Sequence, residues 1–110
     1  MIEDTIGKIE SRIQATDAIN QDRRAELLSL LHTLKSEVAS LSKTHEEEAA
    51  SIAGFTQVSA HEATRETQDP RLLRLSLDGL SSSVSGFEKS HPKLVQIVNA
   101  ISNTLSNLGI

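Results

Sequence analysis

Apolar residues recur at helical spacing along the chain, and the longest such series lies in its last third. Its steps alternate between four and three residues, which is the 3.5-residue spacing of a helix seam that packs on another helix. We name this series the heptad ladder: Leu73, Leu77, Leu80, Val84, Phe87, His91, Leu94, Val98, Ile101, Leu105 and Leu108. Only His91 interrupts its apolar character. The ladder predicts a helical packing surface and indicates no chemistry.

Two amphipathic segments precede the ladder. Isoleucines at every third or fourth position predict a first helix over residues 2–15. A leucine stripe predicts a second helix over residues 20–43, for which Asp17 or Asn20 is a suitable N-cap. The main stripe consists of Leu27, Leu31, Leu34, Val38 and Leu41. We expect this stripe to pack on the heptad ladder, within one chain or between chains.

The segment after residue 43 has two alternative interpretations. Continuing the stripe places His45 and Glu48 on the seam, followed by Ile52 and Phe55, as in one long helix. Alternatively the helix breaks or kinks near Lys43, and a new one covers residues 45–65. Thr44 followed three residues later by Glu47 matches a capping box and favours the break.

The clearest boundary in the chain lies at residues 67–70. Asp69 suits an N-cap, and Pro70 suits the first helical position because its missing N–H has no partner there. We expect a helix over residues 70–90, including the serine-rich run 81–86, whose small residues would be exposed. His91-Pro92 then marks a kink or a restart, followed by a helix over residues 91–107 with Gly109 as its C-cap.

These patterns predict an all-α protein with a single helical domain over residues 1–110. No alternating β-branched run and no Asn-Gly or Asp-Gly turn indicates a strand or hairpin. We expect an antiparallel helical bundle, or a coiled-coil hairpin, of four to five helices with heptad seams. Its main connections would lie at about residues 16–20 and 66–70.

The last predicted helix has an unusual polar side. From Leu94 to Leu108 there is no charged residue, although an exposed helix face normally carries Glu and Lys. The pattern favours burial on more than one side, as at an oligomer seam. A chance excess of Ser and Asn is the plainer explanation, and membrane-surface binding would need flanking cations that are missing.

Charge and composition exclude several partner classes. Residues 1–69 contain 13 acidic and 7 basic residues, a net charge of −6, whereas residues 70–110 carry +2. Nucleic acids require clustered Lys and Arg, so we expect no nucleic-acid partner. The acidic start does not resemble a signal peptide, and no apolar run approaches about 18 residues, so we expect a cytoplasmic protein without membrane contact.

The residues capable of chemistry do not form a recognisable site. His45 and His61 each begin a near match to HExxH, but Ala49 and Arg65 stand where the second histidine is needed to hold zinc. No nucleophile elbow or phosphate-binding glycine loop occurs. There is no cysteine for thiolate chemistry. The sequence therefore predicts no enzyme, no catalytic residue, no metal and no cofactor.

His91-Pro92 is the one place where chemistry and geometry coincide. As a functional element, His91 would be a contact residue or a pH-sensitive group on the seam. In the plainer interpretation, His91 packs at a helix junction and Pro92 fixes the direction of the chain.

The C-terminal segment resembles a known family. Phe87-Glu88 followed by His91-Pro92 and Leu94, with the closing sequence 105–110 (LSNLGI), is similar to the pattern of small bacterial proteins called domain of unknown function 4404. The resemblance is specific over the C-terminal residues, loose over residues 20–41 and slight over residues 44–69. It implies a short, mostly helical bacterial cytoplasmic protein and assigns no activity or catalytic residue.

The leading functional hypothesis is a non-enzymatic helical protein that self-associates through heptad seams, most simply as a homodimer. The alternative is a small adaptor whose uncharged C-terminal helix docks on another, unidentified protein. For either, the candidate interaction residues are Phe87, His91, Pro92, Leu94, Val98, Ile101, Leu105 and Leu108.

Overall fold

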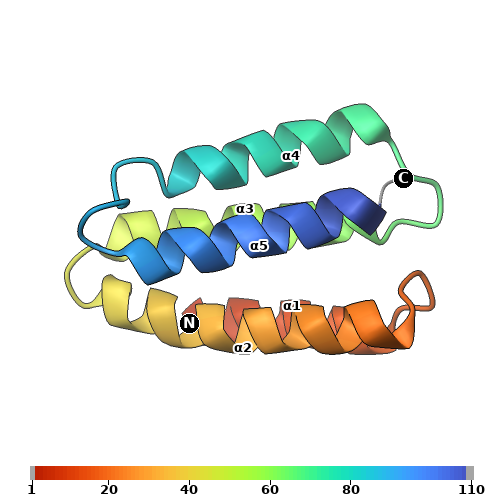
Figure 1. The fold of residues 1–110 in the computed structure, drawn as a ribbon, viewed down its shortest axis with the longest axis horizontal. Helices are drawn as coiled ribbons and strands as arrows, with labels where there is room; N and C mark the ends of the chain where they lie inside the picture. The colour runs from red at the N-terminus through yellow and green to blue at the C-terminus, as the bar shows by residue number, and fades with distance from the viewer. Residues whose placement is uncertain (1, 109–110) are drawn as a thin grey trace.

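The computed structural model describes residues 2–108 of the chain, which fold into an all-α bundle (Figure 1). Its helices are α1 (Ile2–Ala15), α2 (Gln21–Ser42), α3 (Glu46–Ala63), α4 (Pro70–Ser83) and α5 (Pro92–Leu108). Successive helices run antiparallel, and the bundle measures 37 × 24 × 21 Å.

The helices form three levels, with α3 in the centre. In Figure 1, α1 and α2 lie at the bottom, α3 and α5 in the middle, and α4 at the top. Helix α3 packs against all four other helices. Most of its buried residues are small, which lets the neighbouring helices approach closely. They are Ala49, Ile52, Ala53, Thr56, Ser59, Ala60, Glu62 and Ala63.

Two of the expected helix caps are present. The Asn20 side chain accepts a hydrogen bond from the Arg23 backbone N–H (2.9 Å) and begins α2. The Asp69 carboxylate accepts from the backbone N–H groups of Arg71 (3.0 Å) and Leu72, with Pro70 as the first residue of α4. Each cap satisfies N–H groups that have no partner inside the helix.

The helix is interrupted at residues 43–45, but the capping box predicted there is wrong. His45, not Thr44, is the N-cap of α3, and its side chain makes no capping hydrogen bond. The Thr44 hydroxyl instead bonds the His45 ring (2.8 Å), and the Thr44 N–H donates to the Leu41 carbonyl (3.1 Å). Thr44 therefore closes the end of α2 rather than opening α3.

The helix predicted over residues 70–90 is wrong at its C-terminal end, because α4 stops at Ser83 and residues 84–90 form turns. Gly86 has a φ of +97°, which a helix does not tolerate. Both carboxylate oxygens of Glu88 accept from the Gly86 N–H, at 3.0 and 3.1 Å. The serine-rich run thus leads into a tight connection, and the predicted C-cap Gly109 lies outside the described residues.

The heptad ladder contributes its residues to the core of the chain in two antiparallel halves. From the α4 half, Leu73, Leu80 and Val84 are buried. From the α5 half, Leu94, Val98, Ile101 and Leu105 are buried. Helix α5 packs on α2, whose five predicted stripe residues are also buried. Within residues 2–108, helix α4 does not pack against α2. Only the α5 half of the ladder therefore packs on the α2 stripe.

Polar contacts join the helices at the edges of the core. The Lys35 ammonium lies 2.6 Å from the Glu10 carboxylate and links α2 to α1. Arg12 Nε donates to the Thr64 hydroxyl (2.7 Å) and links α1 to the end of α3. The Gln68 side-chain amide donates to the Ala63 carbonyl (2.7 Å), which steadies the loop before α4.

None of the five helices within residues 2–108 combines the length and the hydrophobicity that a membrane span requires.

Candidate functional site

Half of the candidate interaction residues are not available on the surface. Four of them, all on α5, are fully buried in the chain's own core: Leu94, Val98, Ile101 and Leu105. Leu108, Phe87 and His91 are half-buried, and only Pro92 is exposed, at the first position of α5. A partner could reach the buried four only if the bundle opened.

Phe87 and His91 belong to a cluster of three rings that also includes His45. The ring centroids lie 5.5 Å apart for His45 and Phe87, 5.4 Å for Phe87 and His91, and 6.1 Å for the two histidines. All three pairs meet edge to face, the arrangement that aromatic rings favour. The cluster joins the α2–α3 connection to the α4–α5 connection at one end of the bundle.

The connection around this cluster is fixed by hydrogen bonds from its own residues. The His91 N–H donates to the Phe87 carbonyl (2.8 Å), and the His91 ring nitrogen Nδ1 bonds the Ser90 hydroxyl (2.9 Å). Together with the Glu88 contacts to Gly86, these bonds give Phe87, Glu88 and His91 a structural role in turning the chain from α4 into α5. The geometry agrees with the plainer interpretation of His91-Pro92.

Replacing Phe87 by Ala should therefore loosen two connections at once. We expect a loss of about 1.5 kcal/mol in the free energy of unfolding, because a half-buried ring and its two edge-to-face contacts disappear. Urea unfolding followed by circular dichroism measures the loss. His32→Ala, at an exposed position of α2, serves as the control and should change little. Equal stability of the two variants would contradict a structural role for the cluster.

A different surface carries the exposed apolar side chains. Phe55 and Val58 on α3 are 41% and 48% exposed, and Leu72 and Leu75 on α4 are 38% and 60% exposed. They are the large apolar side chains that the described part of the chain leaves exposed. We name the surface that they form the α3–α4 outer face. Scattered apolar residues are ordinary on a protein surface, but four on one pair of packed helices form a patch.

Helix geometry and one contact place these side chains together. Phe55 and Val58 are three residues apart, as are Leu72 and Leu75, so each pair shares one side of its helix. The Phe55 ring lies directly over Gly79 of α4, where a Cβ atom would overlap the ring edge. Because Gly79 lies one turn beyond Leu75, this contact turns the exposed sides of the two helices toward the same seam. Gly79 therefore provides the space in which the ring lies across α4.

Charged side chains border the α3–α4 outer face. Arg71 and Arg74 are exposed near the start of α4, and Asp78 follows one turn after Arg74. The acidic first turn of α3, which includes Glu48, lies at the opposite end of the pair because α3 and α4 are antiparallel. At the Arg71 end, the Arg65 guanidinium is neutralised by Glu62, at 2.8 Å.

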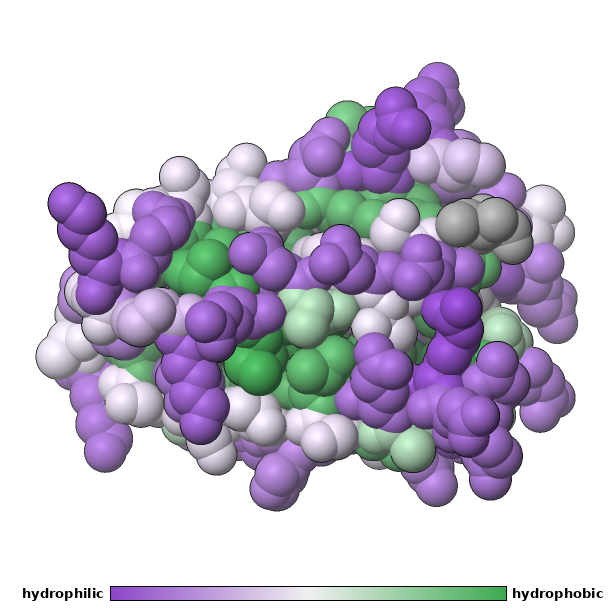
Figure 2. Space-filling view, in the orientation of Figure 1, coloured by the Kyte–Doolittle hydropathy of each residue, from purple (hydrophilic) through white to green (hydrophobic). Residues whose placement is uncertain are grey.

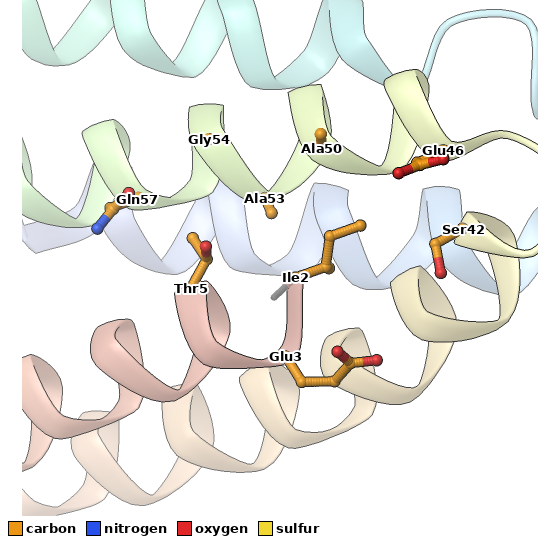
Figure 3. Close-up of a pocket in the computed structure, with 9 residues that line it drawn as sticks. All are labelled: Ile2, Glu3, Thr5, Ser42, Glu46, Ala50, Ala53, Gly54 and Gln57. Atoms are coloured by element: carbon orange, nitrogen blue, oxygen red, sulfur yellow. The ribbon is translucent and has the colours of Figure 1, made fainter.

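Two open grooves lie between α3 and α1, and Val58 borders the second of them as well as the α3–α4 outer face. The first is drawn in Figure 3 and is lined by Ile2, Glu3, Thr5, Ser42, Glu46, Ala50, Ala53, Gly54 and Gln57. The second is lined by Lys8, Ile9, Arg12, Gln57, Val58, Ala60 and His61. Small residues on α3 leave the first groove open. In Figure 3, Gly54, Ala50 and Ala53 supply little more than backbone to the first groove, whose polar groups come from scattered positions.

The histidines do not gather into a metal site with the acidic residues. Within residues 2–108, no group of three or more His, Asp and Glu side chains converges in a way that could hold a metal ion. Glu62, in the second near match to HExxH, is buried, and its carboxylate binds Arg65.

In the face shown in Figure 2, apolar patches emerge between rows of hydrophilic side chains.

Sequence reasoning missed the α3–α4 outer face. The helical phase placed Phe55 on the buried seam together with Ile52, but Ile52 is buried and Phe55 is largely exposed. The alanines at positions 49, 53, 60 and 63 could have indicated this surface. They form much of the buried side of α3, so that a large residue such as Phe55 can lie on the exposed side. On α4, Leu72 and Leu75 lie outside the heptad ladder and could have been recognised as surplus apolar residues.

Comparison with known proteins agrees with the resemblance in the C-terminal segment and extends it. The sequence model of the domain of unknown function DUF4404 matches residues 2–110, including the region 44–69 in which the resemblance was slight. Neither the curated proteins nor the solved structures contain a match to the chain. Because the match spans almost the whole sequence, the chain belongs to the DUF4404 family.

Proposed function

We propose that the chain is a non-enzymatic helical protein that acts by association, and that the α3–α4 outer face is its contact surface. The observation that carries this proposal is the gathering of Phe55, Val58, Leu72 and Leu75 on one pair of helices. Contiguous exposed apolar side chains are typical of protein interaction sites. The cytoplasmic location expected from the sequence is part of the same proposal.

This proposal keeps self-association but moves it away from the heptad ladder. The ladder residues of α5 already pack on α2 within the chain, so their use between chains would cost the core of the monomer. The α3–α4 outer face can be covered without any change in the fold. Covering apolar surface stabilises an assembly by about 25 cal/mol for each Å² removed from water.

The adaptor hypothesis predicted that α5 docks on another protein. The exposed residues of α5 are Pro92, Lys93, Gln96, Asn99, Asn103, Ser106 and Asn107. This surface offers hydrogen-bonding groups but few apolar side chains, and interfaces usually bury an apolar centre. The α3–α4 outer face is therefore the better candidate, whether the partner is a second copy or another protein.

The proposal predicts that mass depends on concentration. Absolute mass from light scattering after size exclusion should rise above 11.9 kDa as the protein is concentrated. Refractive index must serve as the detector, because the chain has no Trp or Tyr. The double variant Val58→Ser, Leu75→Ser should remain at 11.9 kDa and keep its helical content, because both side chains are exposed.

A matched control tests whether the position of the apolar change matters. Val95→Ser removes a partly buried apolar side chain from α5, away from the α3–α4 outer face, and should associate like the wild-type chain. Wild-type protein that stays at 11.9 kDa at every concentration would refute self-association. Association that survives in the double variant would refute the role of this face.

A further inference from the structure

We propose that two copies of the chain pack through the α3–α4 outer face about a two-fold axis that crosses both helices. Each α4 would then lie antiparallel to α4 of the second copy, with Leu75 near the axis and Arg71 beside Asp78 of the second copy. This inference rests on the proposed function and adds the identity of the partner and its orientation.

The apolar residues lie where such an axis needs them. The contact between Phe55 and Gly79 sets the register of the antiparallel helices α3 and α4. Counting along both helices from this contact places Val58 level with Ser76, and Glu62 level with Leu72. The four apolar side chains therefore lie within about two helical turns, from the middle of α3 to the first turn of α4, with Leu75 near their centre. A two-fold axis through the centre of this patch would bring the patch of one copy onto the patch of the other.

The charges at the two ends distinguish between the possible orientations. Arg71 lies on one side of Leu75, near the start of α4, whereas Asp78 lies on the other side, toward the end of the helix pair that carries Glu48. A two-fold axis parallel to the helices would place like ends together. An axis across the helices places opposite ends together, and charges of opposite sign then approach.

Arg71 and Asp78 are suited to a contact between copies. The Arg71 side chain is 82% exposed, and its only ion pair within residues 2–108 is a 4.0 Å contact with Asp69. Arg74 and Asp78 are one turn apart, but the basic residue comes first, which is the weaker order for a pair within a helix. Arg71 and Asp78 can therefore each form an ion pair with a second copy.

The size of the face predicts a weak dimer. Two helices about 20 Å across together and about 20 Å long offer about 400 Å² for each copy. Specific interfaces bury about 600–1,000 Å² for each partner, so this face is smaller than a standard interface. We expect a dissociation constant on the order of tens of micromolar, and a dimer that is best detected at high concentration.

Cross-linking tests the orientation directly, because the chain has no cysteine and each introduced thiol is unique. Full-length Arg71→Cys and Asp78→Cys variants are mixed and treated with a short bismaleimide. The proposal predicts a mixed product that joins position 71 of one copy to position 78 of the other, in excess over the product of either variant alone. Asp17→Cys, in the exposed α1–α2 turn, is the control and should stay uncoupled.

Charge reversal supplies an independent readout. Arg71→Glu and Asp78→Arg should each weaken the dimer about tenfold, because every substitution occurs twice at a two-fold interface. The double reversal should restore affinity to within about threefold, because the two signs are exchanged together. Asp17→Arg makes the same change in charge as Asp78→Arg but lies away from the face, and should have little effect.

The outcomes separate this inference from the proposed function. A dimer in which position 75 couples to position 58 of the other copy, and 71 does not couple to 78, would overturn the orientation but keep self-association. A monomer at every concentration would overturn both. A complex with a different protein that needs Val58 and Leu75, without any dimer, would keep the contact surface and overturn the second copy as its occupant.

Discussion

Replacing Ile101 by Ala should lower the free energy of unfolding by about 3 kcal/mol, the largest effect that we expect from a single substitution. Ile101 is fully buried in the α5 half of the heptad ladder, where α5 packs on α2. Its removal loses apolar transfer energy and leaves a cavity that helices fixed on several sides cannot easily close. A large part of the stability of a protein of 110 residues would be lost.

The effect should not depend on protein concentration, because the contacts of Ile101 lie within one chain. Urea unfolding followed by far-ultraviolet circular dichroism at low and high concentration measures both quantities. The control is Leu75→Ala, which removes the same kind of side chain from a position 60% exposed and should cost less than about 0.5 kcal/mol at low concentration. Equal losses for the two variants would mean that the ladder is not the core of the monomer.

The second large effect is expected from Arg24, which holds the α1–α2 connection. Its guanidinium donates to the carbonyls of Gln14 (2.9 Å), Thr16 (2.9 Å) and Ile19 (2.8 Å). The Gln14 carbonyl lies in the last turn of α1, where the helix itself supplies no donor, and the carbonyls of Thr16 and Ile19 follow the end of α1. Arg24→Ala should destabilise the protein by about 2 kcal/mol, since all three acceptors lose a charged donor together.

Neighbouring substitutions make this prediction specific. Arg24→Lys should recover at most half of the loss, because an ammonium cannot span three carbonyls as a planar guanidinium does. Arg23→Ala removes the same charge one position earlier, while the backbone N–H of residue 23 remains bonded to Asn20, and should cost less than about 0.5 kcal/mol. The comparison is made by thermal and urea unfolding. A loss of stability at position 23 as large as that at position 24 would indicate that the change in net charge, and not the loss of the Arg24 hydrogen bonds, is responsible.

The sequence predicted the helical fold well, because helix spacing and caps are local signals. Asn20 and Asp69 begin helices where their side chains can accept from the next turn, and Pro70 follows in the first turn, where its missing N–H has no partner inside the helix. The end of α4 was less predictable. Val84 and Phe87 continue the ladder in phase, but Gly86 between them adopts a positive φ, and its N–H bonds to the Glu88 carboxylate.

The position of the contact surface could not be predicted from spacing alone. A 3.5-residue period shows that a helix side is covered, but it does not show whether the cover comes from the same chain or from another one. The α5 half of the ladder packs on α2. The predicted interaction residues Leu94, Val98, Ile101 and Leu105 are therefore buried within the chain. On α3, the small residues took the buried side, and Phe55 was left on the surface.

The ring cluster and the hydrogen bonds of the Arg24 guanidinium could not be predicted from the sequence either, because each depends on tertiary structure. His45 and Phe87 are far apart in the sequence and meet only because two connections close the same end of the bundle. Arg24 binds carbonyls of the preceding turn, and any basic residue near a helix start would have looked the same. Both features act through geometry that the order of residues does not reveal.

The central claim is that the heptad ladder closes within a single chain. Dilution of the wild-type protein from about 100 µM to about 1 µM, followed by circular dichroism and urea unfolding, tests it most directly. We predict that the helical signal and a cooperative transition persist at the lowest concentration, with at most a small shift in the midpoint as the weak dimer separates. Loss of helical signal on dilution would show that the ladder needs a second chain, and would contradict the account.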